Sequence, residues 1–173
     1  DLTESLPVDQ VGQVLQLQPG LDDGPNGTTL SIRGGRADEA AYAAANTGAI
    51  LAATERFFGQ PYPFPKLDLV AYPRSTFGGA MENPGLVTYT SQLLLARPNE
   101  MSPLFEQRFM GTTAHEIAHM WFGDYVTMVW WDDLWLNESF ASWLASVVVA
   151  ELRPDWPRDG WRSRQRLQAI EFD

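Results

Sequence analysis

HEIAH, at residues 115–119, is the stretch of this chain that points most sharply to a structure. Residues four apart on a helix lie on the same face, so His115 and His119 can both reach a single zinc ion. Glu116 lies beside them, where it can take a proton from a water molecule at the metal. The spacing therefore predicts a helix that carries two metal ligands and a general base.

WLNE, at residues 135–138, offers a third ligand, Glu138, which follows His119 after a gap of eighteen residues and comes from a neighbouring helix. Three protein ligands leave the fourth position of a tetrahedral zinc ion open, as in catalytic sites, whereas structural sites use four. An H-E-x-x-H pattern can arise by chance, but the chain has only two histidines and both lie in this motif. We therefore expect one Zn²⁺ per chain, bound by His115, His119 and Glu138, in a hydrolase.

Composition indicates a soluble globular protein. The chain has 173 residues and 45% apolar content, enough to bury one core. Its net charge of −10 argues against nucleic acid as a partner, because phosphate binding needs clustered Lys and Arg. There is no cysteine, so no disulfide can form and the cellular compartment is not indicated. No apolar run is long enough to span a membrane, and the first residues do not resemble a signal peptide.

Periodicity and capping signals place the motifs on regular elements. Ser102 followed by Pro103 predicts the start of the HEIAH helix, which should end near Phe122 before Gly123. Further helices are expected at about 38–58, 133–152 and 155–172, and strands at 66–72 and 85–89.

The composition of the chain changes near residue 36. Residues 1–35 are rich in Gly, Pro and Asp, and two alternating segments at 14–17 and 29–32 flank a turn at 22–27. This pattern predicts a β-hairpin at the end of a β-rich domain. We expect a domain boundary here, with residues 36–173 forming an incomplete catalytic domain.

GAMEN, at residues 79–83, is a second signal with two interpretations. Small residues before an acidic one can simply be a turn that leads into a strand. Alternatively, an edge strand at the lip of a cleft could pair with a peptide substrate, and Glu82 would attract a cationic group such as a free α-amine. The residues alone do not decide between the two.

GAMEN, HEIAH and WLNE in this order resemble the aminopeptidase N family of gluzincin metallopeptidases. The gap before Glu138 matches that family, as do the flanking segments at 62–68 and 120–124, and the resemblance covers about residues 30–172. It implies an α+β, thermolysin-like catalytic domain, with zinc-bearing helices and a small sheet whose edge strand lines the cleft. It also implies further domains in the same protein.

The resemblance assigns roles to the metal motif. Zinc would be bound by His115, His119 and Glu138, and Glu116 would be the general base that passes its proton to the leaving amine. Each histidine should donate its second ring N–H to an acceptor, for which we considered Asp132, Asp133 and Ser142.

The resemblance also assigns the substrate-binding residues, Gly79 to Asn83. Glu82 would bind the α-ammonium group of a peptide with a free N-terminus. The backbone at Gly79 and Ala80 would align the peptide, Met81 would line the pocket for its first side chain, and Asn83 completes the motif.

Three alternatives to an aminopeptidase remain, because this sequence departs from the family's pattern in places and because related zinc sites catalyse other reactions. A thermolysin-type endopeptidase would not need Glu82. The epoxide-hydrolase branch of the family is disfavoured because Ala80 stands where the motif of that branch has Gly. The third alternative, a catalytically impaired zinc-binding fragment or a non-catalytic module, is supported only by the missing domains and by the family's oxyanion-stabilising tyrosine, which is expected beyond Asp173. Neither Tyr89 nor Tyr125 stands at the position of that tyrosine.

Five of the seven tryptophans gather around the motif, at 121, 130, 131, 135 and 143. A packed core around the zinc-bearing helices is the interpretation that we favour, and an aromatic cage for a cation or a sugar is the alternative.

Overall fold

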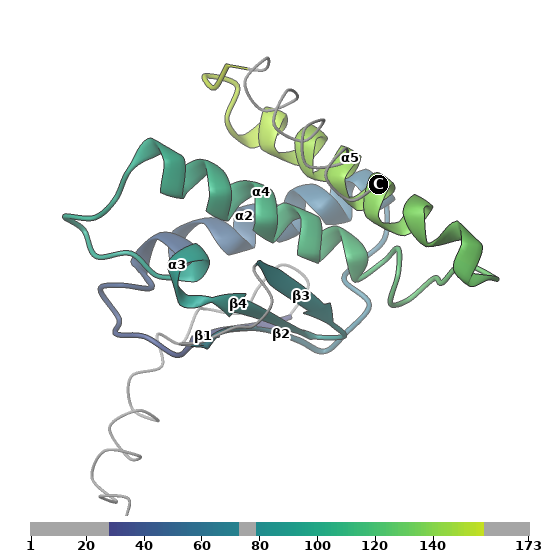
Figure 1. Cartoon of the computed structure of the whole chain (residues 1–173), viewed down its shortest axis with the longest axis horizontal. Coiled ribbons are helices and arrows are strands. Elements are labelled where there is room, and N and C mark those ends of the chain that lie inside the picture. The colour runs from purple at the N-terminus through teal and green to yellow at the C-terminus, as the bar shows by residue number, and fades with distance from the viewer. Residues whose placement is uncertain (1–27, 73–78, 158–173) are drawn as a thin grey trace, which may run out of the picture.

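The computed structural model describes residues 28–72 and 79–157, which form a layered α+β arrangement (Figure 1). A four-stranded sheet lies on one side, helices α2 and α4 cover one of its faces, and α5 packs outside them. The α+β class predicted from the sequence is confirmed. The elements are β1 (Thr29–Arg33), α2 (Ala41–Phe58), β2 (Lys66–Tyr72), β3 (Ala80–Asn83), β4 (Leu86–Thr90), α3 (Ser91–Leu94), α4 (Pro103–His119), the 3-10 turn η2 (Trp131–Asp133) and α5 (Leu134–Leu152).

The sheet is mixed, with the order β1-β2-β4-β3. Strands β1, β2 and β4 are parallel, and β3 pairs antiparallel with β4. Pro84 and Gly85 connect this antiparallel pair, and Gly85 has a φ of 73°, which glycine adopts at no steric cost. The GAMEN segment therefore forms an edge strand, as expected. Strand β1 pairs with β2, so residues 29–33 belong to the same sheet as the predicted strand at 66–72.

Local signals fix the ends of two helices. The Ser102 side chain accepts a hydrogen bond from the Phe105 N–H at 3.2 Å, and Pro103 is the first residue of α4. Helix α2 ends at Gly59, whose φ of 64° is left-handed. Helix α2 begins at Ala41, three residues after the predicted start near residue 38, and Asp38 pairs with Arg36.

The core lies between the sheet and α4. Leu69 and Val87 are fully buried neighbours on β2 and β4, and they point to the same side as Tyr89. The Tyr89 hydroxyl lies 3.2 Å from the Thr113 hydroxyl, so the one polar group of this aromatic side chain is paired inside the core. These contacts fix α4 over β4 and thereby hold HEIAH near the sheet edge.

The prediction that the five tryptophans form a packed core is wrong for four of them. Trp121 is buried, with 3% of its surface exposed. Trp130, Trp131, Trp135 and Trp143 are 51–78% exposed. Helical spacing shows which side chains share a face, but it does not show whether another element covers that face.

Two predictions lie outside the described residues: the hairpin with its turn at 22–27, and the part of the last helix beyond residue 157. Residues 154–157 are not helical. Among the helices of residues 28–72 and 79–157, none is both long and apolar enough to cross a bilayer.

Candidate metal centre

Helices α4 and α5 bring the three predicted metal ligands together. The Nε2 atoms of His115 and His119 are 3.0 Å apart. Glu138 places Oε2 3.2 Å from His115 Nε2 and Oε1 3.6 Å from His119 Nε2. One ligand atom from each of these three residues lies within 4.8 Å of the others, so they form a group that could hold one metal ion.

The spacing of this group suits zinc. Nitrogen and oxygen ligands 2.0–2.1 Å from a tetrahedral ion are about 3.3 Å from one another. The distance between the two Nε2 atoms, 3.0 Å, and the distances from them to the Glu138 oxygens, 3.2 and 3.6 Å, bracket that value. Two imidazoles and one carboxylate are also a donor set that zinc accepts, and they occupy three of its four positions.

Each imidazole has an acceptor at its other nitrogen. His115 Nδ1 lies 3.3 Å from the Ser142 hydroxyl, one of the acceptors considered from the sequence. His119 Nδ1 lies 3.2 Å from the Phe122 carbonyl oxygen and 3.3 Å from Asn137 Oδ1. Because a carbonyl only accepts, His119 carries its proton on Nδ1 and leaves the Nε2 lone pair for a metal.

Neither acceptor of His119 was predicted from the sequence. Asn137 directly precedes the predicted ligand Glu138, and this position is the signal by which it could have been predicted as an acceptor. Asp132 and Asp133, the other two acceptors considered, form no hydrogen bond to a histidine in the described part of the chain.

Gly123 allows the turn after α4 to pass close to this pair. Its φ is 133°, and a Cβ atom there would lie 2.7 Å from Asn137 Oδ1 and 3.2 Å from His119 Nδ1. Its N–H donates to the Val126 carbonyl, which closes the turn. Helix α4 ends at His119, earlier than the predicted end near Phe122, and the next two N–H groups, of Met120 and Trp121, donate to carbonyls three residues back.

Glu116 is the most buried carboxylate of the site, with 5% of its surface exposed and no hydrogen-bond partner for Oε2 within the described residues. Burial raises the pKa of Glu116 to about 8, and the charge of Glu82 adds to this, while His119 opposes it. A carboxylate with its pKa near neutrality can both accept and return a proton, as a general base must.

The charges around the three predicted metal ligands favour a positive charge at the point where the ligands meet. Burial alone would lower the pKa of His119, but the hydrogen bond to Glu138 and the charge of Glu82 raise it to about 9. Hydrogen bonds from His115 and His119 hold the pKa of Glu138 well below its usual value. The negative potential at the two Nε2 atoms suits a divalent cation.

Strand β3 directs one GAMEN side chain at this group. Glu82 Oε1 lies 3.9 Å from His119 Nε2. Side chains alternate along a strand, so Ala80 shares the face of Glu82, whereas Met81 and Asn83 lie on the other face and are exposed. Met81 is thus not directed at the metal group.

Gly79 directly precedes β3, and Ala80 is the first residue of this edge strand. The Gly79 carbonyl accepts from the Thr90 N–H at 3.0 Å, and Ala80 pairs with Tyr89. The outer edge of β3 has no strand partner in the described residues, as the predicted pairing with a peptide would require.

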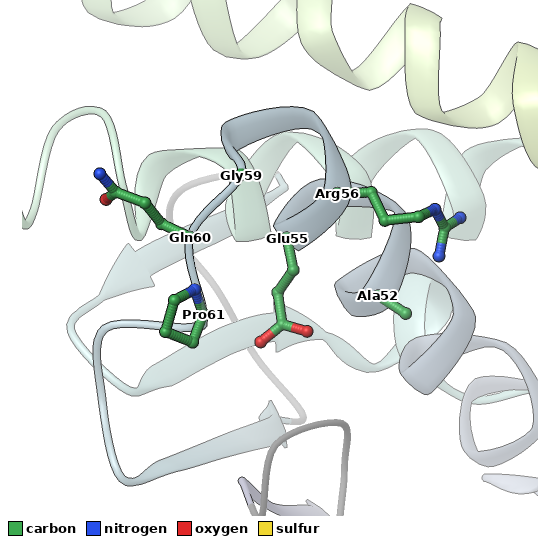
Figure 2. A pocket seen from close by; sticks show the side chains of 6 residues that line it. All are labelled: Ala52, Glu55, Arg56, Gly59, Gln60 and Pro61. Carbon is green, nitrogen blue, oxygen red and sulfur yellow. The ribbon is translucent and has the colours of Figure 1, made fainter.

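A separate open pocket lies at the end of α2 and has a volume of about 420 Å³ (Figure 2). It is lined by Ala52, Glu55, Arg56, Gly59, Gln60 and Pro61, none of which was predicted as a site residue. Glu55 accepts a hydrogen bond from the Tyr62 N–H, and Arg56 pairs with Glu151. The pocket is therefore distinct from the metal group.

Comparison with known proteins gives one family and a consistent set of relatives. The model of the peptidase family M1 domain matches residues 42–172. Aminopeptidase M1-D of Oryza sativa subsp. japonica is 51% identical over 102 residues, which are 59% of this chain and 12% of that protein. Glutamyl aminopeptidase of Bos taurus is 46% identical over 74% of this chain and 13% of its own length. Aminopeptidase N of Acetobacter pasteurianus is 43% identical over 69% of this chain and 34% of its own length. The chain thus spans only a minor part of these relatives.

Proposed function

Because this chain belongs to peptidase family M1, we propose that it carries the metal centre and the amine-binding edge strand of a zinc-dependent aminopeptidase with a thermolysin-like catalytic domain. The observation that carries the proposal is the convergence of His115, His119 and Glu138 beside the buried Glu116 and the edge strand β3. The relatives named above are aminopeptidases by name, which supports the same reaction.

The metal would be held by Nε2 of each histidine and by the Glu138 carboxylate. When bound, zinc supplies a Lewis acid that polarises the scissile carbonyl and acidifies water. Ser142 and Asn137 hold the two imidazole rings so that both Nε2 atoms face the same point.

Glu116 moves the proton. Its unpaired, buried Oε2 accepts a proton from the attacking water, and its raised pKa favours holding that proton until the leaving amine takes it. In this reaction, water adds to the carbonyl carbon, the C–N bond breaks, and the amine leaves with the proton from Glu116.

Glu82 selects the free N-terminus. A carboxylate 3.9 Å from His119 Nε2 would bind the substrate's α-ammonium next to the metal, so only the first peptide bond lies in reach of Glu116. The outer edge of β3, with the backbone of Gly79 and Ala80, would align the peptide by main-chain hydrogen bonds.

Hydrolysis of a fluorogenic alanyl amide by the zinc-loaded protein, beside its N-acetylated twin, tests this proposal. Cleavage of the free amine alone, abolished by a zinc chelator, is the expected result. Cleavage of both substrates would instead support a thermolysin-type endopeptidase. Cleavage of neither, with one equivalent of zinc bound, would support the alternative of a zinc-binding segment that does not suffice for catalysis.

A further inference from the structure

Tyr89 and Thr113 form a hydrogen bond inside the apolar core between the sheet and α4. Both residues are fully buried, and the Tyr89 hydroxyl donates to the Thr113 hydroxyl at 3.2 Å. Burial raises the pKa of Tyr89, so its hydroxyl stays protonated and can donate. A buried pair of hydroxyls adds little net stability, because a Phe–Val pair of the same shape can be equally stable or more so. The contact is therefore better explained by the position that it fixes than by the stability that it adds.

This hydrogen bond lies close to the strand that carries Glu82. Tyr89 is opposite Ala80 in the register of β3 and β4, and Glu82 is two residues after Ala80 on β3. Opposite residues of an antiparallel pair share a face of the sheet, and so do alternate residues of one strand. The side chains of Tyr89 and Glu82 therefore lie on the same face, about 7 Å apart along the strands.

Helix α4 meets this strand pair at two points. Tyr89 contacts Thr113 within the helix, and Glu82 Oε1 lies 3.9 Å from His119 Nε2 at the end of the helix. Thr113 and His119 are six residues apart, which is about 9 Å along a helix. A shift of the strand pair along α4 would therefore break the Tyr89–Thr113 hydrogen bond and move Glu82 away from the metal group at the same time.

The hydroxyl pair opposes such a shift more strongly than the apolar contacts around it. Apolar packing has no preferred direction, whereas a hydrogen bond weakens steeply as its distance and angle change. We propose that Tyr89 is a positioning residue for the α-ammonium site: its hydrogen bond to Thr113 holds β3 where Glu82 can bind a free N-terminus. This inference rests on the proposed function, in which Glu82 binds the amine.

A purely structural role for this hydroxyl pair makes a different prediction. If the Thr113 hydroxyl only satisfied a tyrosine that the core needs for its ring, removing the hydrogen bond would change the stability of the fold and the affinity for every ligand alike. It would not change the preference for an amine.

Isothermal titration of the zinc-loaded chain with alanine hydroxamate and with N-acetylalanine hydroxamate separates these roles. Both probes bind metal, and only the first carries an ammonium group. The measured quantity is the preference for the free amine, which is the dissociation constant of the acetylated probe divided by that of the free probe.

The variants remove or keep single hydroxyl groups. Tyr89→Phe removes the donor and keeps the ring, Thr113→Val removes the acceptor and keeps the shape, and Thr113→Ser keeps the acceptor. Tyr62→Phe is the matched control, because the Tyr62 hydroxyl is also buried but has no hydrogen-bond partner among the described residues.

We expect Tyr89→Phe and Thr113→Val each to reduce the preference for the free amine about fivefold, while affinity for the acetylated probe stays within about twofold. The double variant should lose no more than either single variant, because both substitutions remove the same hydrogen bond. Thr113→Ser and Tyr62→Phe should match the wild type.

The preference in Tyr89→Phe decides between the roles. A preference equal to that of the wild type, with the preference lost in Glu82→Gln, would overturn the inference and leave the proposed function intact. Equal weakening of both probes would also overturn it, in favour of the structural role. A wild type that prefers neither probe would overturn the proposed function and the inference together.

Discussion

Replacing Gly123 by alanine tests how the fold orients the second zinc ligand. The new Cβ would lie 2.7 Å from Asn137 Oδ1, closer than real Cβ contacts allow, and 3.2 Å from His119 Nδ1. The Asn137 side chain must therefore move, and His119 loses one of its two acceptors. The φ of 133° adds backbone strain, because L side chains rarely adopt it.

The expected magnitudes follow from these two effects. Strain of about 1–3 kcal/mol and one lost hydrogen bond of about 1 kcal/mol should lower the free energy of unfolding by about 2–4 kcal/mol in total. Loss of an orienting partner typically weakens metal binding about 10- to 100-fold. Urea unfolding measures the first quantity, and competition with a chromophoric chelator measures the affinity for zinc.

Gly59→Ala is the matched control. Gly59 also has a positive φ, 64°, but a Cβ there would meet nothing within 4 Å. The Gly59→Ala substitution should lower the free energy of unfolding by about 1 kcal/mol and leave the affinity for zinc unchanged. Zinc affinity in Gly123→Ala equal to that in Gly59→Ala would refute the idea that this close approach orients His119.

Three further predictions concern the base, the other histidine and the sheet. Glu116→Gln should lower the rate of peptide hydrolysis at least 100-fold with zinc affinity within about threefold of the wild type, as measured by initial rates and chelator competition. Ser142→Ala should weaken zinc binding about tenfold because His115 loses its acceptor; unchanged affinity would assign that hydroxyl no role at the metal. Burial alone would raise the pKa of Asp68, but hydrogen bonds from Lys66 and Ser31 hold it below the usual value. Asp68 is thus a group with a depressed folded pKa, so it stabilises the fold above the unfolded pKa of about 3.9. Asp68→Asn should be about 1 kcal/mol less stable at pH 7, and urea titrations should show this difference vanishing as the pH falls through the folded pKa.

The sequence was informative where short-range chemistry determines the structure. Ser102 and Pro103 mark the start of α4, and the spacing of HEIAH places both histidines on one helix face, as found. The four-residue spacing of the histidines and the helical pattern around Glu138 were enough to predict the three ligands that converge. The domain boundary near residue 36 and the roles of the GAMEN residues remain predictions.

Features that depend on contacts between distant segments were not predictable. Gly123, in the turn after α4, passes close to Asn137 on α5, and capping rules do not include such a contact. The exposure of Trp130 and Trp131 depends on what packs over the segment between α4 and α5, which periodicity does not reveal.

X-ray absorption at the zinc edge of the metal-loaded protein would examine the proposed centre itself. The account predicts one zinc per chain with four nitrogen or oxygen ligands at about 2.0–2.1 Å, two of them imidazoles, and the loss of both imidazole signals in the double variant His115→Ala, His119→Ala. Six oxygen ligands without imidazole, or an unchanged spectrum in that variant, would contradict it.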